Sequence, residues 1–254
     1  MSGLLKHDIL KHGKTEEEKL MLAKAYDAYT FSEKRDMACF TGFLSPADIA
    51  LADMAFKGAD ASFYGGFEEA ERCVFGFGVT DKSEFPLCII KSEGDFSGVS
   101  HRDFLGSLMG LGITRENIGD IVKKDDCCYI FVLRKMAEYI SDNFTSVKNS
   151  NVKNEICECL DVTVEKEFEM IKKSVASLRA DAVVAAVFNL SRGDAAEAVK
   201  RGLVTLNYKI LESLDKKISG GDTLSLKGKG KAMIIKAEDY SKKGRLFLEI
   251  KKYK

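Results

Sequence analysis

Short apolar runs alternate with amphipathic stretches through the middle of this 254-residue chain, and their order limits the folds that it can adopt. Short apolar or β-branched runs are typical of strands, whereas apolar residues spaced three and four apart are typical of helices. On these criteria strands are expected at 73–79, 87–91, 118–122, 127–133, 145–148 and 155–164, with helices at 100–112 and 134–144. This alternation predicts a compact α+β sandwich.

The two flanks of the sandwich follow different patterns. On the N-terminal side, helices are expected at 16–30 and 31–40, and Ser45-Pro46 has the capping serine and first-turn proline of a third. The first 60 or so residues are therefore expected to be mostly helical. On the C-terminal side, two short helices, the second ended by Gly202, precede strands expected at 203–207, 223–227, 232–237 and 246–251. The chain as a whole is expected to be a multidomain α+β protein.

Several function classes are disfavoured by composition. The chain has no run of eighteen apolar residues, and its first residues turn polar too early for a secretory signal, so no membrane association is expected. The seven cysteines are scattered without a C-x-x-C pair, and Cys157-Glu158-Cys159 could chelate a metal only with distant help. We therefore expect no metal, no disulfide framework and a cytoplasmic location.

The net charge of zero conceals an uneven distribution. From Ser177 onward the chain has 17 Lys and Arg against 9 Asp and Glu, whereas the first 176 residues have 22 against 30. Such asymmetry is typical of a nucleic-acid-binding module attached to a more acidic body. A solvated basic surface would give the same charge count, so the motifs have to distinguish the two readings.

Four linked motifs occupy the basic segment. They are Leu178-Arg179-Ala180-Asp181, Leu190-Ser191-Arg192-Gly193-Asp194-Ala195-Ala196, Lys200-Arg201-Gly202-Leu203-Val204-Thr205-Leu206-Asn207 and Gly220-Gly221-Asp222-Thr223-Leu224-Ser225-Leu226. In this order and spacing they resemble the RNA-binding domain of ribosomal protein S-four, the alpha-L motif. The chain departs from that pattern at Ala180, where Leu is usual, and at Gly193-Asp194, where the usual pair is more polar or basic. Asp194 places a negative charge near the expected phosphate site.

The residues themselves fit RNA contact. A helix that starts near Ser191 presents backbone N–H groups and a positive dipole end to a phosphate. Arg192 lies in its first turn and Arg179 precedes the other helix, so each can fork hydrogen bonds onto phosphate. Lys200 and Arg201 lie at the far end of the helix, where they favour the C-terminal dipole as well as nearby RNA.

Three residues near these motifs have structural interpretations. Gly202 is expected to end the helix, and Asn207 to shape the turn that follows. Asp181 is expected to anchor a basic residue or a helix cap rather than act as a general base.

The run Lys227-Gly228-Lys229-Gly230-Lys231 combines three cations with a flexible backbone that can approach a phosphate strand. A solvated hairpin loop is the alternative interpretation. Beside an RNA-binding motif, phosphate contact by Lys227, Lys229 and Lys231 is the favoured one.

Further stretches extend the resemblance to nearly the whole chain. Residues 63–72 (FYGGFEEAER), 100–109 (SHRDFLGSLM) and 115–121 (RENIGDI) are similar to signature stretches of the YlmH family. The resemblance implies a helical N-terminal domain at 1–72, a central RNA-recognition-like α/β domain at 73–166 and the alpha-L domain at 177–254. It also implies a ribosome-associated quality control role. Members of this family bind obstructed large ribosomal subunits carrying peptidyl-tRNA, and they support alanine tailing of the stalled chain. The implied partners are large-subunit rRNA and tRNA.

His101-Arg102-Asp103 invites a catalytic interpretation, because His and Asp are acid–base residues. Two residues apart at a helix start, the side chains of His101 and Asp103 do not face each other, so catalysis is disfavoured. His101 and Arg102 are expected either to contact RNA or to hold the helix to the sheet. An RNA-modifying enzyme, such as a pseudouridine synthase or methyltransferase docked through the alpha-L domain, is the alternative. The segment Phe75-Gly76-Phe77-Gly78-Val79 lacks the helix that a cofactor loop requires. We therefore expect a non-enzymatic protein with no cofactor, no catalytic residue and no small-molecule substrate.

Overall fold

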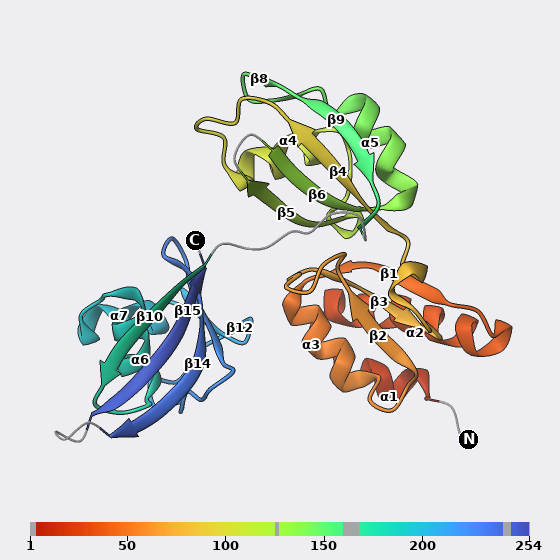
Figure 1. Ribbon diagram of the computed structural model, residues 1–254. Helices are drawn as coiled ribbons and strands as arrows, with labels where there is room; N and C mark the ends of the chain where they lie inside the picture. The colour runs from red at the N-terminus through yellow and green to blue at the C-terminus, as the bar shows by residue number, and fades with distance from the viewer. Residues whose placement is uncertain (1–3, 125–126, 160–167, 241–244, 254) are drawn as a thin grey trace. The chain divides into compact units, whose positions relative to one another are not determined.

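The computed structural model describes residues 4–124, 127–159, 168–240 and 245–253, and its chain divides into two compact units, Met1–Glu165 and Lys166–Lys254 (Figure 1). Each unit mixes helices with antiparallel sheet, so the chain is α+β as the sequence predicts. Among the described residues, no helix combines the length and apolar character needed to cross a membrane.

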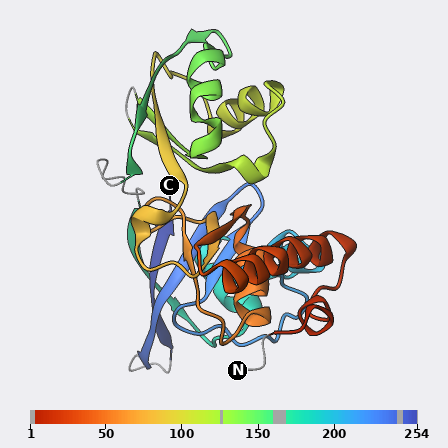
Figure 2. The same ribbon diagram turned by 90° about the vertical axis from the view of Figure 1, so that its right-hand side faces the viewer.

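The first unit begins with a small three-stranded sheet and its helices. Strand order is β1-β3-β2, all antiparallel, and the long helix α2 packs across one face (Figure 2). Capping boxes at Thr15 and Ser45 start α2 and α3, with Pro46 at the first helical position of α3 as predicted. The elements are α1 (Lys6–Leu10), α2 (Glu16–Arg35), β1 (Cys39–Leu44), α3 (Pro46–Ala55), β2 (Ala61–Tyr64) and β3 (Cys73–Phe77).

One expectation for this region is wrong. The helices expected at 16–30 and 31–40 form a single helix, α2, which ends at Arg35 because Asp36 adopts a left-handed conformation with φ of 51°, and Cys39 then begins strand β1. Most of the first 60 residues are helical, as expected, and the core of the region also includes the sheet residues Phe75 and Phe77, buried against α2 and α3. Strand β3 starts at residue 73, and its partners are β1 and β2.

The second part of this unit contains a four-stranded antiparallel sheet in the order β5-β6-β4-β9. Along the chain its elements follow the order βαββαβ, which is the ferredoxin-like arrangement. The sequence predicted this succession of strands and helices, but it did not indicate which strands pair. The elements are 3₁₀ turns at Lys82–Glu84, Arg115–Asn117 and Arg134–Met136, β4 (Leu87–Glu93), α4 (His101–Gly110), β5 (Ile118–Lys124), β6 (Cys127–Leu133), α5 (Ala137–Asn143) and β9 (Lys153–Cys157), with a hairpin of β7 (Ser146–Val147) and β8 (Ser150–Asn151). Residues 160–164 of the last expected strand lie outside the described residues.

Both faces of this sheet are buried over much of their area. Helices α4 and α5 cover one face, where Ile90, Ile130 and Val132 are fully buried. On the other face Ile89 and Phe131 are equally buried, and they pack with aromatic residues from the preceding part of the unit. The RNA-recognition-like domain expected here would leave one face of its sheet open. In this sheet the face that carries Ile89 and Phe131 is instead covered by apolar side chains from residues 40–85.

A partly buried arginine, Arg72, helps to hold this arrangement. The guanidinium of Arg72 donates through Nε to the carbonyl of Ile118 (3.0 Å) and through Nη2 to those of Phe43 (2.9 Å) and Arg115 (3.1 Å). The buried carboxylate of Asp120 accepts from the backbone N–H of Arg72 at 3.1 Å. Burial lowers the pKa of Arg72 to about 10, still far above neutrality, so it stays charged. The cation thereby joins β1, the link before β5 and β5 itself.

The second unit is a six-stranded antiparallel sheet, in the order β10-β15-β14-β13-β11-β12, with two helices packed on it. Helix α6 ends at Asn189, left-handed with φ of 53°, and the short link to α7 follows at once. The elements are β10 (Phe168–Val175), α6 (Ala180–Phe188), α7 (Arg192–Lys200), β11 (Val204–Leu206), β12 (Lys209–Ile210), β13 (Thr223–Leu226), β14 (Gly230–Tyr240) and β15 (Leu246–Tyr253). The elements expected from the sequence are all present here.

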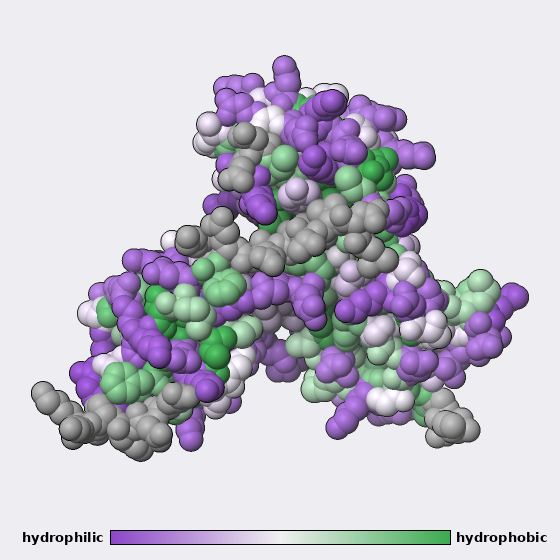
Figure 3. All heavy atoms as spheres, in the orientation of Figure 1, coloured by the Kyte–Doolittle hydropathy of each residue, from purple (hydrophilic) through white to green (hydrophobic). Residues whose placement is uncertain are grey.

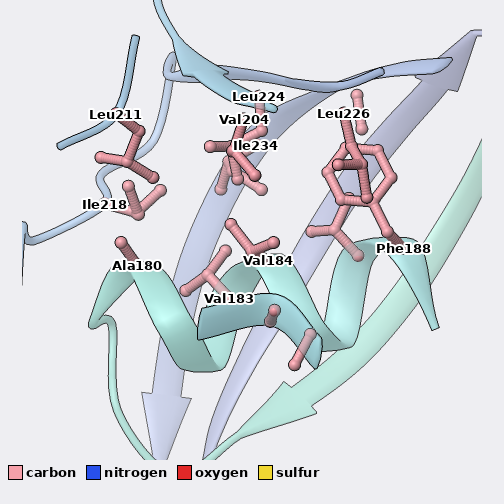
Figure 4. Packing of buried hydrophobic residues seen from close by; sticks show 14 of the residues in the cluster. Ala180, Val183, Val184, Phe188, Val204, Leu211, Ile218, Leu224, Leu226 and Ile234 are labelled. Carbon is pink, nitrogen blue, oxygen red and sulfur yellow. The ribbon is translucent and has the colours of Figure 1, made fainter. Parts of the chain in front are cut away.

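The core of this unit lies on one face of the sheet only. Valines from α6, including Val183 and Val184, pack against Ile234 and Leu224 on the strands (Figure 4). Along a strand, alternate side chains point to opposite faces, so the neighbours of these core residues project from the other face. The helices therefore leave the second face of the sheet to other contacts.

Candidate nucleic-acid interface

Two arginines and a carboxylate meet where helices α6 and α7 begin. Asp181 lies in the first turn of α6, between Arg179, the residue before that helix, and Arg192, the first residue of α7. Its Oδ1 accepts from Nε of Arg179 at 3.2 Å and its Oδ2 from Nη2 of Arg192 at 2.8 Å. One carboxylate thus fixes the positions of two guanidinium groups. The anchoring role expected for Asp181 is confirmed by these bonds.

In this clamp the carboxylate is nearly buried, whereas the two guanidinium side chains are about half exposed. The side chain of Asp181 is only 13% exposed, while those of Arg179 and Arg192 are 49% and 59% exposed. Burial by itself raises the pKa of Asp181, but the hydrogen bonds from Arg179 and Arg192 outweigh it and hold the pKa below its ordinary value. The carboxylate is therefore ionised at neutral pH. It orients the arginines while their outer surfaces remain accessible.

A guanidinium has five N–H donors, and this clamp uses few of them. Arg192 donates one to Asp181, and Arg179 donates to Asp181 and, through Nη1, to the exposed Asp215. The remaining donors can reach a phosphate. Beside Arg179 and Asp215 lies an open hollow of about 410 Å³, also lined by Lys217 and Leu246.

The start of α7 is capped from within the chain. Ser191 Oγ accepts from the backbone N–H of Asp194 at 3.0 Å and donates to its carboxylate at 2.7 Å. Ser191 therefore has a structural use, and its RNA contact stays a prediction. The carboxylate of Asp194, which was expected to weaken phosphate binding, is engaged with the capping hydroxyl.

The opposite end of α7 carries Lys200 and Arg201, both exposed. Gly202 adopts φ of 66°, and its N–H bonds to the carbonyl of Val199 while that of Leu203 bonds to Ala198. These two bonds form a Schellman cap, so the predicted helix stop is confirmed. Lys200 and Arg201 favour the helix dipole there, and contact with RNA remains a prediction for both.

The predicted Lys-Gly segment is divided by the structure. Lys227 and Lys229 are exposed in the tight turn between β13 and β14, where Gly228 adopts φ of 82°. Lys231 instead lies in β14, with its ammonium 4.4 Å from the ring centroid of Tyr253 and 5.7 Å from that of Tyr208. The three lysines are therefore not equivalent. The turn expected at Asn207 is confirmed by its φ of 47° and by a 2.9 Å bond from the N–H of Thr223 to its side chain.

His101 and Arg102 are exposed in the first turn of α4, in the first unit. The neighbouring Asp103 accepts from the backbone N–H of Ser100 at 2.7 Å and pairs with Lys148 at 2.8 Å. These bonds, led by that of Lys148, lower the pKa of Asp103 to about 2. Asp103 is thus committed to capping and ion pairing.

Four residues near Lys231 were not predicted from the sequence. Besides Tyr208 and Tyr253, they are Lys251, whose ammonium lies 4.0 Å from the ring centroid of Phe168, and Phe168 itself. The alternation of Lys251 and Tyr253 along one strand is a signal that they share a face. Tyr208 stands directly after Asn207 in a tight turn, where glycine is the common choice, and this is a second signal.

Residues 80–161 match the family model described as "Putative RNA-binding domain in YlmH". The matched range contains the whole βαββαβ sheet with α4 and α5. The ribosome-associated protein quality control protein P2 of Bacillus subtilis (strain 168) is 29% identical over 247 residues, covering 94% of this chain and 96% of that protein. The chain thus resembles the YlmH family in this segment, and the B. subtilis protein over nearly its whole length.

A solved YlmH structure is similar in fold. It is the cell division protein ylmH from Streptococcus pneumoniae, with a TM-score of 0.50 and 19% identity, covering 60% of this chain and 98% of that one. At this identity the likeness concerns the fold alone. In the present chain, His101 and Arg102 lie inside the segment that matches the family model, whereas the Asp181 clamp and the Lys-Gly turn follow it.

Proposed function

We propose that this chain is a non-enzymatic RNA-binding factor of ribosome-associated quality control. It acts in the cytoplasm on obstructed large ribosomal subunits, where it binds large-subunit rRNA and the tRNA attached to the stalled chain. By holding that assembly it supports alanine tailing of the stalled chain. The observation that carries the proposal is the similarity, over 94% of the chain, to a protein named for ribosome-associated quality control.

The arginine clamp supplies the mode of contact. Arg179 and Arg192 are held by Asp181 before RNA arrives, so less side-chain freedom is lost on binding than with two unrestrained arginines. Each guanidinium can donate two parallel hydrogen bonds to a phosphate. Lys200, Arg201, Lys227 and Lys229 add exposed positive charge in the same unit, and His101 and Arg102 contribute contacts from the YlmH RNA-binding segment.

Binding without catalysis is consistent with the groups that could act as acids or bases. A general base must be able to take up a proton near neutral pH. Asp181 and Asp103 both have lowered pKa values because cations hydrogen-bond to them. The exposed cations can contact phosphate directly and need no cofactor for that purpose.

The proposal is tested by sedimentation of the full chain with purified large subunits at several salt concentrations. Each phosphate contact that releases counterions adds about −0.9 to the slope of log affinity against log salt. The loss of Arg192 removes one charge-assisted contact, so Arg192→Ala should weaken binding about tenfold and reduce that slope. Arg35→Ala is the matched control, because Arg35 is an exposed arginine of α2 that lies over Phe31.

A capture experiment tests the cellular role. The native protein should bring down large subunits that carry peptidyl-tRNA in preference to empty large subunits. Equal binding of Arg192→Ala and the original chain would make the clamp assignment wrong. Turnover of uridine in RNA, of S-adenosylmethionine or of nucleotide by the pure protein would overturn the non-enzyme proposal.

A further inference from the structure

The helix-free face of the C-terminal sheet carries an alternating row of rings and lysines. Core residues such as Ala232 and Ile250 point toward α6 and α7, so their strand neighbours Lys231 and Lys251 project from the opposite face. The row, which we call the lysine–ring row, consists of Tyr208, Lys231, Tyr253, Lys251 and Phe168.

Strand register brings the five side chains together from distant parts of the chain. Ala232 is opposite Lys252 in the β14–β15 pairing, which places Lys231 beside Tyr253. Tyr253 is in turn opposite Phe168 of β10. The ammonium of Lys231 lies 5.7 Å from the ring centroid of Tyr208 and 4.4 Å from that of Tyr253.

Lys251 continues the row in the same manner. Its ammonium lies 5.4 Å from the ring centroid of Tyr253 and 4.0 Å from that of Phe168. Each lysine is thus held between two rings, at distances typical of cation–π contact. The row extends from the β11–β12 turn across β14 and β15 to β10.

The backbone at Tyr208 is strained. Asn207 and Tyr208 form the two-residue turn between Leu206 and Lys209, with φ of 47° and 65°. Asparagine tolerates this left-handed region, but for a bulky residue such as tyrosine it is an outlier, and glycine is preferred at the second position of such turns. Strained residues cluster at binding sites. The turn therefore places an aromatic ring beside Lys231 at a cost that glycine would avoid.

The face around the row is exposed and partly apolar. Phe168 is 45% exposed and Met170 54% exposed, and Figure 3 shows hydrophobic and hydrophilic residues side by side over this unit. Lys227 and Lys229 extend the positive charge from the adjoining turn. The acidic Glu249 of β15 is paired with Lys172 at 2.7 Å, so its charge is compensated.

We propose that the lysine–ring row binds an unpaired RNA strand, with bases stacked on the rings and phosphates paired with Lys231 and Lys251. Proteins that hold single strands combine positive charge along the backbone path with aromatic rings on which bases stack. The bases of a duplex are already stacked on one another, so only an unpaired strand can use the rings. The inference rests on the proposed RNA-binding function, and it adds a second RNA face on a different surface from the Asp181 clamp.

Two probes separate this face from the clamp. One is a labelled oligouridine of about ten nucleotides, within the range that single-strand binders cover. The other is a labelled, fully paired RNA hairpin with a tight loop. Fluorescence anisotropy with the full chain measures the affinity for each, and a melting curve checks each variant.

Tyr208→Gly is the decisive variant, because it removes a ring and relieves the strained backbone at the same time. It should weaken oligouridine binding about tenfold, the effect of losing one stacked base, without a lower melting temperature. Lys251→Met keeps the side-chain stem and should weaken oligouridine binding severalfold. Tyr139→Ala, at an exposed tyrosine of α5, is the control and should leave both affinities unchanged.

The outcomes distinguish the two proposals. Oligouridine binding that is lowered by Tyr208→Gly but not by Arg192→Ala, together with the reverse pattern for the hairpin, supports two separate RNA faces. If the chain binds the hairpin and not oligouridine, or if Tyr208→Gly binds oligouridine normally, the lysine–ring row is not an RNA site and the proposed function stands. If neither RNA binds, both proposals are wrong.

Discussion

The two larger sheets of this chain differ in what covers their second face. In both, helices pack on the first face, α4 and α5 in one case and α6 and α7 in the other. The second face of the β5-β6-β4-β9 sheet is filled by Phe131, Leu87 and aromatic residues of the preceding segment. The second face of the C-terminal sheet instead carries the lysine–ring row and exposed apolar side chains.

The comparison shows that strand order alone does not identify an RNA-binding face. The βαββαβ order is shared with modules that bind RNA on their open sheet, yet here Ile89 and Phe131 on that face are fully buried. A stacking surface requires rings that a base can reach. Among the described residues, the C-terminal sheet carries such rings, Tyr208, Tyr253 and Phe168, although its strand order does not indicate an RNA-binding face.

The largest expected effect comes from the covered face. Phe131→Ala should destabilise the first unit by about 3–5 kcal/mol, because it removes a fully buried ring and leaves a cavity. The ring lies 4.7 Å from that of Phe67, centroid to centroid, so the contact between the sheet and the preceding segment is lost. Chemical denaturation monitored on residues 1–165 within the full chain measures the change.

Phe247→Ala is the matched control on the other sheet. Phe247 is 46% exposed on β15, and its loss should cost less than about 1 kcal/mol. If the two substitutions lowered stability by similar amounts, the second faces of the two sheets would be equally buried, contrary to our comparison.

An intermediate effect is expected at the clamp. Asp181→Asn leaves two arginines without their charged acceptor, and should cost about 1–3 kcal/mol of stability in the second unit. Because the folded-state pKa of Asp181 lies below its ordinary value, its contribution is present above that value and is lost as pH falls through the folded-state pKa. Unfolding measured from pH 7 down to pH 2 should therefore show a smaller acid-dependent loss in the variant.

RNA binding provides a second readout for the same variant. Hairpin affinity should fall, since Arg179 and Arg192 lose their fixed orientation, while oligouridine affinity should not. An unchanged hairpin affinity would mean that the carboxylate does not position the arginines for RNA. Asp194→Asn is the comparison, because the side chain of Asp194 bonds to the capping Ser191 and not to the arginines. Since this change removes a negative charge near the phosphate site, it should not lower hairpin affinity.

Local patterns in the sequence predicted local structure well. Ser45-Pro46 began a helix, Gly202 ended one, and nearly every strand of the C-terminal unit lies where its apolar run indicated. The charge and hydrogen-bonding capacity of Asp181 likewise suggested an anchor. These features depend on neighbouring residues, which a single sequence contains.

Long-range features could not be predicted in the same way. The burial of Phe131 depends on the segment that folds over it, and the helix expected over 31–40 failed because β1 pairs with β3, more than 30 residues away. The lysine–ring row joins Tyr208, Tyr253 and Phe168 through strand register. Its members are separated by up to 85 positions in the chain, so no local motif contains them.

The smallest expected effect concerns the two helix starts that carry predicted RNA-binding residues. Both begin at a serine whose hydroxyl bonds to the carboxylate of an aspartate three residues later, but Asp103 at the start of α4 is also paired with Lys148. This ion pair is the largest cause of its pKa of about 2. Lys148→Met should therefore raise the pKa of Asp103 toward the ordinary value, which a carboxyl NMR titration measures.

The sign of the accompanying pH effect follows from the lowered pKa. Asp103 favours the folded state above the ordinary carboxyl pKa, and this contribution disappears as pH falls through about 2. In Lys148→Met the loss should begin at higher pH, with the α4 start otherwise intact because the hydrogen bonds that Ser100 donates to the Asp103 carboxylate remain. If the pKa of Asp103 stayed at about 2 in that variant, the hydrogen bonds from Ser100 alone would account for it. The start of α4 would then resemble that of α7 in depending on its serine.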